Sequence, residues 1–222
     1  MSENSFQNPE EMAEIEGEIP TKRLPVALCL DTSGSMSTGG AIDELNKAVA
    51  TFFTELKNDP QTEDSVETVV IKFGGDVSVV SPFDLVCNAQ IPTFRADGGT
   101  PMGEALTKSI DLLLDRKEGY KSSGLRYSQP ILVVMTDGEP TDSCEKPTKM
   151  IQELTSNKSL TVIPICFGEG SNLKKMKEIT GSSPILFTET TEFIEFFKWL
   201  SSSCSAGTAM TPEQFKKDRQ LD

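Results

Sequence analysis

The sequence predicts an α/β fold with three layers: a doubly wound, mostly parallel sheet with helices on both faces and one antiparallel edge strand. Short apolar runs, typical of strands buried on both faces, alternate along the chain with segments of helical periodicity. A glycine-rich turn between two further apolar runs predicts the antiparallel pair. With 222 residues, 36% of them hydrophobic, the chain is long enough for one sizeable core. A single domain with tails is therefore expected.

The first predicted unit is a strand, a loop and a helix. Residues 24–30 (LPVALCL) form a continuous apolar run that ends abruptly at Asp31. After a turn rich in glycine and serine, apolar residues recur at helical spacing from Ile42 to Leu56, and an Asn-Asp-Pro sequence at residues 58–60 ends that helix. The carboxyl end of the strand thus leads directly into a polar loop.

The middle of the chain predicts a hairpin and a second helix. Residues 68–74 (TVVIKFG) have the pattern of a strand, and the Gly-Gly-Asp turn at residues 74–76 leads into a returning strand at residues 77–81. Further along, Pro101 suits the first position of a helix. The apolar face of that helix carries Leu106, Ile110, Leu113 and Leu114. The polar residues 116–130 predict a loop after it.

The last part of the chain continues the alternation. Residues 131–136 (ILVVMT) predict a third buried strand that stops at Asp137. The elements expected after it are a helix at 144–156, a strand at 160–168, a short helix at 173–180, an edge strand at 185–187, and a closing helix with Phe193, Phe196, Phe197 and Leu200 on its apolar face. Since the carboxyl ends of parallel strands share one edge of a sheet, ligands are expected at that edge.

The predicted boundaries divide the chain into three segments. Residues 1–21 are polar, acidic and nearly free of apolar periodicity, so they are expected to form a flexible arm. Residues 22–205 are expected to form the folded domain. Residues 206–222 lack a periodic apolar pattern and end in the charged stretch FKKDRQLD, which predicts a tail.

Charge and composition exclude several classes of function. The 21 Lys and Arg residues against 34 Asp and Glu residues give a net charge of −13, so neither nucleic acid nor a membrane is an expected partner. The absence of histidine excludes Ser-His-Asp and Cys-His nucleophile chemistry. The five cysteines have no C-x-x-C spacing and are expected to be reduced thiols. The chain shows no signal-peptide pattern and no membrane-length apolar run, which predicts a cytoplasmic location.

Five side chains with oxygen ligands fall at the predicted carboxyl edge of the sheet. Asp31, Ser33 and Ser35 follow the first strand in one loop (DTSGS), Asp137 follows the third buried strand, and Thr100 precedes a helix. Hard oxygen donors without sulfur or imidazole select Mg²⁺, Mn²⁺ or Ca²⁺, and a small ion that keeps several waters fits a site with few carboxylates. The sequence therefore predicts a site for a Mg²⁺-class ion, with Mn²⁺ or Ca²⁺ as alternatives.

The same residues carry a resemblance to a known family. The order D-x-S-x-S after a first apolar strand, a threonine ahead of a helix, and T-D-G after a later strand resembles the metal-ion-dependent adhesion site (MIDAS) of von Willebrand factor A (vWA) domains. The resemblance covers residues 24–203, and every member of the motif is present. It implies a Rossmann-like fold, hydroxyl ligands from Ser33, Ser35 and Thr100, and contact of Asp31 and Asp137 with the ion directly or through water.

The implied function is binding rather than catalysis. Neutral hydroxyl ligands leave the ion much of its positive charge, so the ion gains most from an incoming carboxylate. The expected partner is a protein that presents Asp or Glu, and the chain is not expected to be an enzyme. Residues 23–36 (RLPVALCLDTSGSM) are also similar to bacterial TerY-type proteins of tellurium-resistance and stress operons. That similarity implies an adaptor beside a protein phosphatase or kinase.

Simpler interpretations stay open for the individual residues and for the function. The DTSGS loop fits a helix-capping turn, and Thr100 before a proline fits a plain N-cap. Glu139 and Asp142 are interpreted as solvated loop carboxylates rather than further ligands. The alternative functions are a metal-assisted phosphoester hydrolase, with Glu139 as its general base, and a structural subunit with a vestigial metal site.

Overall fold

The structure, a computed structural model, describes residues 22–168, 171–189, 191–206 and 211–219. Its centre is a sheet of six strands in the order β3-β2-β1-β4-β5-β6. Strand β3 pairs antiparallel with β2, and the other neighbouring pairs are parallel. The predicted fold class, a mostly parallel sheet with one antiparallel edge strand, is confirmed.

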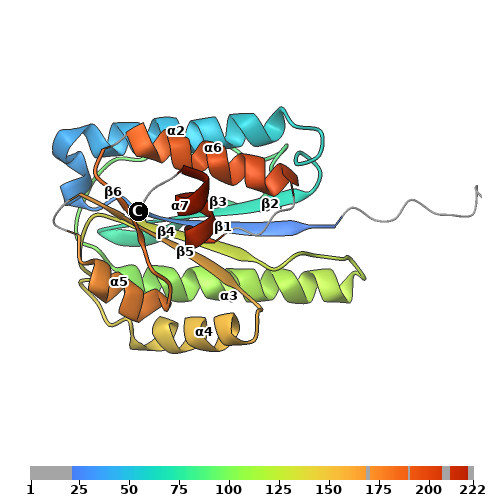
Figure 1. The fold of residues 1–222 in the computed structure, drawn as a ribbon. Coiled ribbons are helices and arrows are strands. Elements are labelled where there is room, and N and C mark those ends of the chain that lie inside the picture. The colour runs from blue at the N-terminus through green and yellow to red at the C-terminus, as the bar shows by residue number, and fades with distance from the viewer. Residues whose placement is uncertain (1–21, 169–170, 190, 207–210, 220–222) are drawn as a thin grey trace, which may run out of the picture.

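Three layers make up the domain. The strands are β1 (Leu24–Asp31), β2 (Val66–Gly74), β3 (Asp76–Leu85), β4 (Ile131–Thr136), β5 (Thr161–Phe167) and β6 (Ile185–Phe187). The helices are the short 3-10 helix η1 (Gly34–Gly40), α2 (Ala41–Lys57), α3 (Met102–Ser122), α4 (Glu145–Ser156), α5 (Leu173–Thr180), α6 (Thr191–Ala206) and α7 (Pro212–Arg219). Figure 1 shows α2 and α6 over one face of the sheet and α3, α4 and α5 over the other. Both faces of the sheet are therefore covered.

The central strand β1 explains why the sequence is apolar at consecutive positions. Val26, Leu28 and Leu30 belong to the core on the α2 and α6 side, whereas Ala27 and Cys29 belong to the core on the α3 and α4 side. Successive side chains of a strand point to opposite faces, so a strand with two covered faces needs apolar residues throughout. The first polar side chain of β1 is consequently Asp31, at the end of the strand.

The strand register brings the predicted site segments to one edge of the sheet. Leu30 of β1 pairs with Met135 of β4 in parallel register. Asp31 and Thr136 are the next residues of these two strands, so both strands end at the same level. This carboxyl edge lies at the left-hand end of the molecule in Figure 1, where η1 and the start of α2 are also found.

The predicted hairpin is confirmed, and its glycines have a packing role. Gly74 pairs with Asp76 across the turn, and Gly75 between them has a φ of 71°. A Cβ atom on Gly74 would lie 2.3 Å from the carbonyl oxygen of Thr32. Only a residue without a side chain lets the hairpin approach the loop after β1 this closely.

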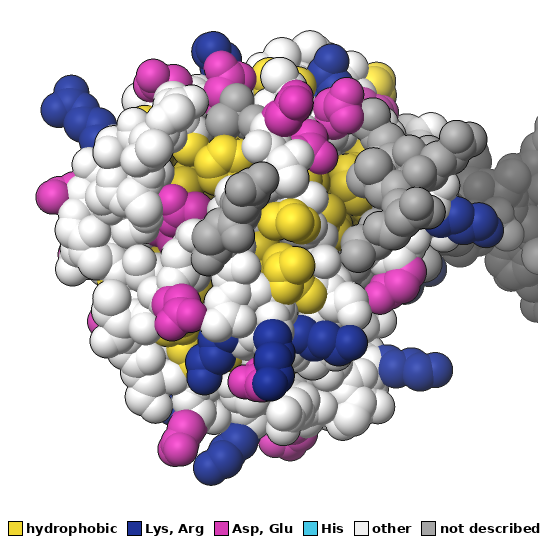
Figure 2. All heavy atoms as spheres, turned by 60° about the vertical axis from the view of Figure 1, so that its left-hand side comes forward, with side chains coloured by type: hydrophobic (Ala, Val, Ile, Leu, Met, Phe, Trp, Pro, Cys, Tyr) yellow, Lys and Arg dark blue, Asp and Glu magenta, His cyan; other side chains and the backbone are white. Residues whose placement is uncertain are grey.

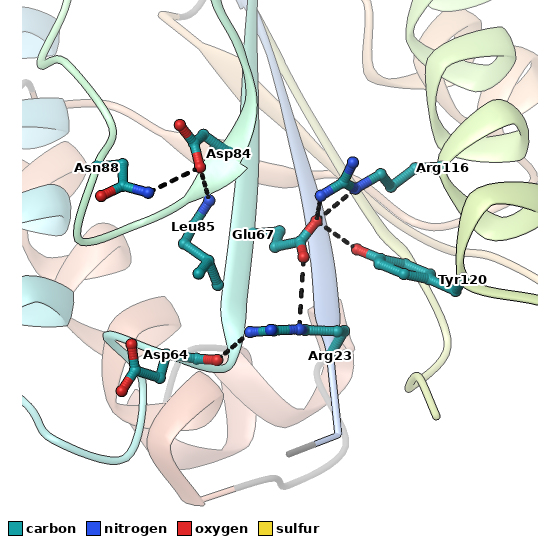
Figure 3. Close-up of polar contacts among 8 residues, drawn as sticks. All are labelled: Arg23, Asp64, Glu67, Asp84, Leu85, Asn88, Arg116 and Tyr120. Carbon is teal, nitrogen blue, oxygen red and sulfur yellow. Dashed lines mark hydrogen bonds and ion pairs between the residues drawn. The ribbon is translucent and has the colours of Figure 1, made fainter. Parts of the chain in front are cut away.

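The predicted polar loop at residues 116–130 is wrong in its first part, because α3 continues to Ser122. The end of this helix meets a buried carboxylate at the amino end of the sheet (Figure 3). Glu67, 3% exposed, accepts hydrogen bonds from Arg116 and from the Tyr120 hydroxyl at 2.7 Å. Arg23 Nε lies 3.6 Å from the other Glu67 oxygen. We call Arg23, Glu67, Arg116 and Tyr120 the Glu67 cluster.

The segment that the sequence predicts as a tail, residues 206–222, contains helix α7. Phe215 of this helix is 2% exposed, and its ring packs against the rings of Phe196 and Trp199 at centroid distances of 5.4 and 5.2 Å. One buried aromatic residue is enough to dock a short helix without creating a periodic pattern. The domain boundaries stay predictions, and the arm at residues 1–21 lies outside the described residues.

Two further expectations concern the environment of the chain. None of the described helices combines the length and the apolar character that a membrane span requires. The five cysteines are free thiols, as the sequence predicts.

Candidate metal centre

Asp31 is fully buried at the end of β1, and neutral donors hold both of its oxygens. The backbone N–H of Ser33 donates to Oδ1 at 2.7 Å, and the Thr136 hydroxyl donates to Oδ2 at 2.5 Å. Thr136 Oγ1 in turn accepts a hydrogen bond from the N–H of Gly138 at 3.1 Å. These bonds connect the end of β1 to the loop after β4 and fix the orientation of the carboxylate.

The hydroxyls of the first loop connect to the second predicted carboxylate. Ser33 Oγ and Ser35 Oγ lie 3.1 Å apart, and Ser35 Oγ donates to Asp137 Oδ1 at 2.7 Å. Ser33 is buried and Ser35 is exposed, so this chain of oxygens runs from the interior to the surface. Four of the five predicted ligands therefore share one hydrogen-bonded network.

Thr100 reaches the same place through backbone contacts. The N–H of Gly34 donates to the carbonyl of Gly98 at 2.9 Å, which fastens the loop before α3 to the DTSGS loop. The carbonyl of Thr100 accepts from the N–H of Thr141 at 2.9 Å, which fastens it to the loop after β4. A Cβ atom on Gly138 would lie 3.7 Å from Thr100 Oγ1, so the hydroxyl faces the Asp137–Gly138 turn. The three predicted segments meet.

Gly98 allows this meeting because it satisfies two constraints at once. Its φ of 66° lies in the left-handed region, and a Cβ atom on it would lie 2.3 Å from the Cα atom of Gly75. A larger residue would separate the hairpin turn from the loop that carries Thr100.

The electrostatics of the site favour a cation. Burial raises the pKa of Asp31 to about 6, against an ordinary value of 3.8; hydrogen bonds from Ser33 and Thr136 lower it, and the charge of Asp137 raises it. Burial also raises the pKa of Asp137. Within the described part of the chain, none of the ion pairs involves either carboxylate. A bound cation would stabilise both carboxylates in their charged form.

The donor set suits a hard divalent ion. It consists of three hydroxyls and two carboxylates, all oxygen donors of the kind that Mg²⁺, Mn²⁺ and Ca²⁺ accept. The described residues contain no cluster of three or more Asp, Glu, Cys or His side chains that would form a metal site by themselves. The serine and threonine hydroxyls are therefore essential to this candidate site, and their role as ligands stays a prediction.

Three nearby residues have structural roles that sequence analysis missed. Thr136 orients Asp31 through a hydrogen bond. Its position in the T-D-G motif could have indicated this role. Asp142, interpreted as a solvated carboxylate, accepts hydrogen bonds from the N–H groups of Gly103 and Glu104 at 2.8 Å and caps α3. Glu139 accepts a hydrogen bond from Asn172 Nδ2 at 2.8 Å. The partners of Asp142 and Glu139 are far away in the chain, so no local pattern revealed them.

Comparison with protein families decides the classification. The family model described as "von Willebrand factor type A domain" matches residues 26–198. The chain belongs to the vWA family. The resemblance stated from the motif is thereby confirmed at the level of the domain. None of the curated proteins matches this vWA domain.

Solved structures show the same fold at low sequence identity. The pilus adhesin SpaC of Lactobacillus rhamnosus GG superposes with a TM-score of 0.67 at 14% identity, covering 83% of this chain and 31% of that one. Proximal thread matrix protein 1 of the mussel byssus gives 0.58 at 15% identity, covering 83% and 49%. Manganese-loaded TRAP of Plasmodium vivax gives 0.59 at 17% identity, covering 82% and 75%. This vWA domain spans about half the length of the mussel structure.

The end of the molecule that carries the site has a mixed surface. Figure 2 brings the left-hand side of Figure 1 forward and shows apolar side chains near the middle of the face, with Lys and Arg grouped below them and Asp and Glu above. Leu173 of α5 and Leu186 of β6 are each 37% exposed. This surface offers both charged and apolar contacts.

Proposed function

We propose that this vWA domain binds one divalent cation of the Mg²⁺ class and uses it to capture an Asp or Glu side chain of a partner protein. Ser33, Ser35 and Thr100 would hold the ion through their hydroxyls, and Asp31 and Asp137 would contribute directly or through water. When bound, the cation supplies positive charge and a coordination position for an incoming carboxylate.

One observation carries the proposal: two buried or half-buried carboxylates and three hydroxyls converge, and no described ion pair neutralises the carboxylates. Charges desolvated in this way are costly unless a counter-charge is supplied. The hydroxyls are neutral, so a divalent ion bound among them keeps positive charge for a partner.

The solved relatives support a divalent metal at this place in the fold. One mussel thread matrix protein structure is described as having a zinc-occupied MIDAS motif, and the TRAP structure is described as manganese-loaded. Both statements concern those proteins. Their agreement with the donor set here supports a divalent cation, and we propose Mg²⁺, with Mn²⁺ or Ca²⁺ as alternatives.

We further propose that the domain is a non-catalytic adaptor. The hydrolase alternative requires Glu139 as a base, and its Oε1 atom accepts a hydrogen bond from Asn172. The similarity of residues 23–36 to TerY-type proteins supports a cytoplasmic role in bacterial stress or phosphosignalling, with a protein phosphatase or kinase as the partner.

Affinity capture tests the proposal. The wild-type protein, immobilised with Mg²⁺, should retain a partner that EDTA releases, and Ser33→Ala should retain none. Ser37→Ala is the matched control, because the Ser37 hydroxyl lies in the same segment but donates to the Gly34 carbonyl. Capture that survives both EDTA and Ser33→Ala would refute metal-dependent binding. Turnover of a generic phosphoester with Mg²⁺, lost in Glu139→Ala, would establish the hydrolase alternative instead.

A further inference from the structure

Helix α3 begins beside the candidate metal centre, and it cannot cap its own first turn through a side chain. Pro101 occupies the N-cap position and makes no side-chain cap hydrogen bond. Ser, Thr, Asp and Asn usually fill this position, because their side-chain oxygens accept hydrogen bonds from the free N–H groups of the first turn. In α3 the N–H groups of Gly103 and Glu104 need an acceptor from elsewhere in the chain.

A carboxylate from the loop after β4 provides that acceptor. Asp142 Oδ1 accepts a hydrogen bond from the N–H of Gly103, and Oδ2 accepts one from the N–H of Glu104, both at 2.8 Å. The N–H groups of Met102 and Ala105 have backbone carbonyls as acceptors. The first turn of α3 is therefore completely capped, and the side-chain part of the cap comes from Asp142 alone.

This cap leaves the hydroxyl of Thr100 without a role in the helix. A threonine just ahead of a helix commonly uses its side-chain oxygen to cap the first turn. Thr100 is 7% exposed, and its hydroxyl forms no hydrogen bond with another of the described residues. A Cβ atom on Gly138 would lie 3.7 Å from this hydroxyl oxygen, so the oxygen faces the turn that follows Asp137. The hydroxyl is thus available to a ligand at the candidate metal centre.

The loop after β4 holds the start of α3 at three successive residues. The N–H of Thr141 donates to the Thr100 carbonyl at 2.9 Å, next to the cap. A Cβ atom on Gly103 would lie only 2.2 Å from the Ser143 carbonyl oxygen, so glycine is needed for this close approach. The same loop begins with Asp137. It therefore carries one predicted ligand of the ion and fixes the place of another.

We propose that Asp142 is a positioning residue of the metal centre: it caps α3 in place of Thr100 and so leaves the Thr100 hydroxyl for the cation. This inference rests on the proposed function and concerns the same site. Without the carboxylate, the N–H groups of Gly103 and Glu104 compete with the cation for the Thr100 oxygen. Binding of the ion then has to break that interaction, which weakens the affinity.

Calorimetric titration of the full chain with Mg²⁺ tests the inference. Asp142→Ala should bind the ion about tenfold more weakly than wild type, as is usual when a residue that orients a metal ligand is removed. Asp142→Asn should recover part of the affinity, because its amide oxygen still accepts one hydrogen bond. Amide hydrogen exchange at Gly103 and Glu104 in metal-free protein should be faster in Asp142→Ala, which reports the loss of the cap independently of the ion.

The outcomes separate this inference from the proposed function. Unchanged exchange in Asp142→Ala would show that Asp142 does not cap α3, and unchanged Mg²⁺ affinity would show that the cap does not position a ligand. Either result would overturn the inference and leave the proposed function standing. A wild-type protein that binds none of Mg²⁺, Mn²⁺ and Ca²⁺ would contradict the proposed function itself.

A double-mutant cycle with Thr100→Ala distinguishes positioning from a general effect of charge or stability. If Asp142 acts through the Thr100 hydroxyl, Asp142→Ala should weaken Mg²⁺ binding about tenfold in the wild-type background and leave it nearly unchanged in the Thr100→Ala background. Titrations extended to millimolar Mg²⁺ measure the weaker affinities. An equal loss in both backgrounds would show that Asp142 acts without Thr100, and would overturn the inference.

Two glycines of α3 provide a matched pair of variants. Gly103 lies against the Ser143 carbonyl, whereas a Cβ atom on Gly119 would meet no neighbouring residue within 4 Å. Alanine favours the helix at both positions. Gly103→Ala should displace the loop that carries Asp142 and weaken Mg²⁺ binding about as much as Asp142→Ala does, while Gly119→Ala should bind the ion like wild type. Equal affinities in the two glycine variants would count against the inference.

Discussion

The two ends of the sheet each bury a carboxylate and neutralise it differently. At the amino end, Glu67 lies against Arg23 and Arg116 and accepts the Tyr120 hydroxyl. At the carboxyl edge, Asp31 is buried just as deeply, but its donors are a neutral N–H group and a neutral hydroxyl. The charged group that affects its pKa is a second carboxylate, Asp137.

This difference separates a carboxylate that the fold neutralises from one that has no counter-charge among the described ion pairs. The protein itself supplies the counter-charge for Glu67, so the Glu67 cluster is complete within the fold. At Asp31 none of the described residues supplies a counter-charge, which is the arrangement expected of a binding site. The two carboxylates should therefore respond differently to substitution when the free energy of unfolding is measured.

Glu67→Ala should cause the largest loss, about 3 kcal/mol in the free energy of unfolding, because it leaves two arginines near the sheet without their counter-charge. Urea denaturation measures the loss. Glu118→Ala is the control: Glu118 pairs with Lys121 on the exposed surface of the same helix, and exposed pairs of this kind contribute little to stability. Equal losses in the two variants would contradict a structural role for the Glu67 cluster.

Asp31→Asn should raise the free energy of unfolding of the metal-free protein, whereas Glu67→Ala should lower it. Burial raises the pKa of Asp31 to about 6 in the folded state, so between pH 4 and 6 the folded protein binds a proton more readily than the unfolded chain. Stability should therefore fall as the pH rises through this window, by up to about 3 kcal/mol. Asparagine removes this dependence and should make the EDTA-treated protein more stable than wild type at pH 7. A less stable variant would mean that Asp31 is structural, like Glu67.

Mg²⁺ should stabilise the wild-type protein by about 2.7 kcal/mol when its concentration is one hundred times the dissociation constant. Thermal unfolding with Mg²⁺ and with EDTA measures the difference. Ser33→Ala should show none, while Glu118→Ala should keep it in full. Stabilisation that persists in Ser33→Ala would place the ion elsewhere.

Tyr120→Phe should have the smallest effect, about 1 kcal/mol, because it removes one hydrogen bond to Glu67 and leaves both arginines in place. The same urea experiment detects it. Since Tyr120 belongs to the opposite end of the sheet, the Mg²⁺ affinity should stay at the wild-type value, and a large drop in that affinity would show that the two ends are coupled.

The site residues at the carboxyl edge could be predicted because they lie close in sequence to the ends of the apolar strands. Each apolar run shows where a strand ends, and Asp31, Ser33 and Asp137 follow those ends within a few residues. The parallel register then brings them together without further information. Both the fold class and the meeting of the DTSGS loop with the Asp137 turn follow from this pattern.

The amino end was not predictable, because its contacts join residues far apart in a polar sequence. Arg116 and Tyr120 meet Glu67 across 49 and 53 positions, and their polar surroundings predicted a loop. Phe215 of α7 is similarly a single anchor in a charged stretch, without neighbours that would create periodicity. Partners of this kind become visible only when the chain is folded.

The most direct test of the metal centre is anomalous diffraction from a crystal grown in Mn²⁺. The account predicts one anomalous peak at the carboxyl edge, within coordination distance of the Ser33, Ser35 and Thr100 hydroxyl oxygens. A peak elsewhere, or a Thr100 hydroxyl turned away from the DTSGS loop with no ion beside it, would contradict the account.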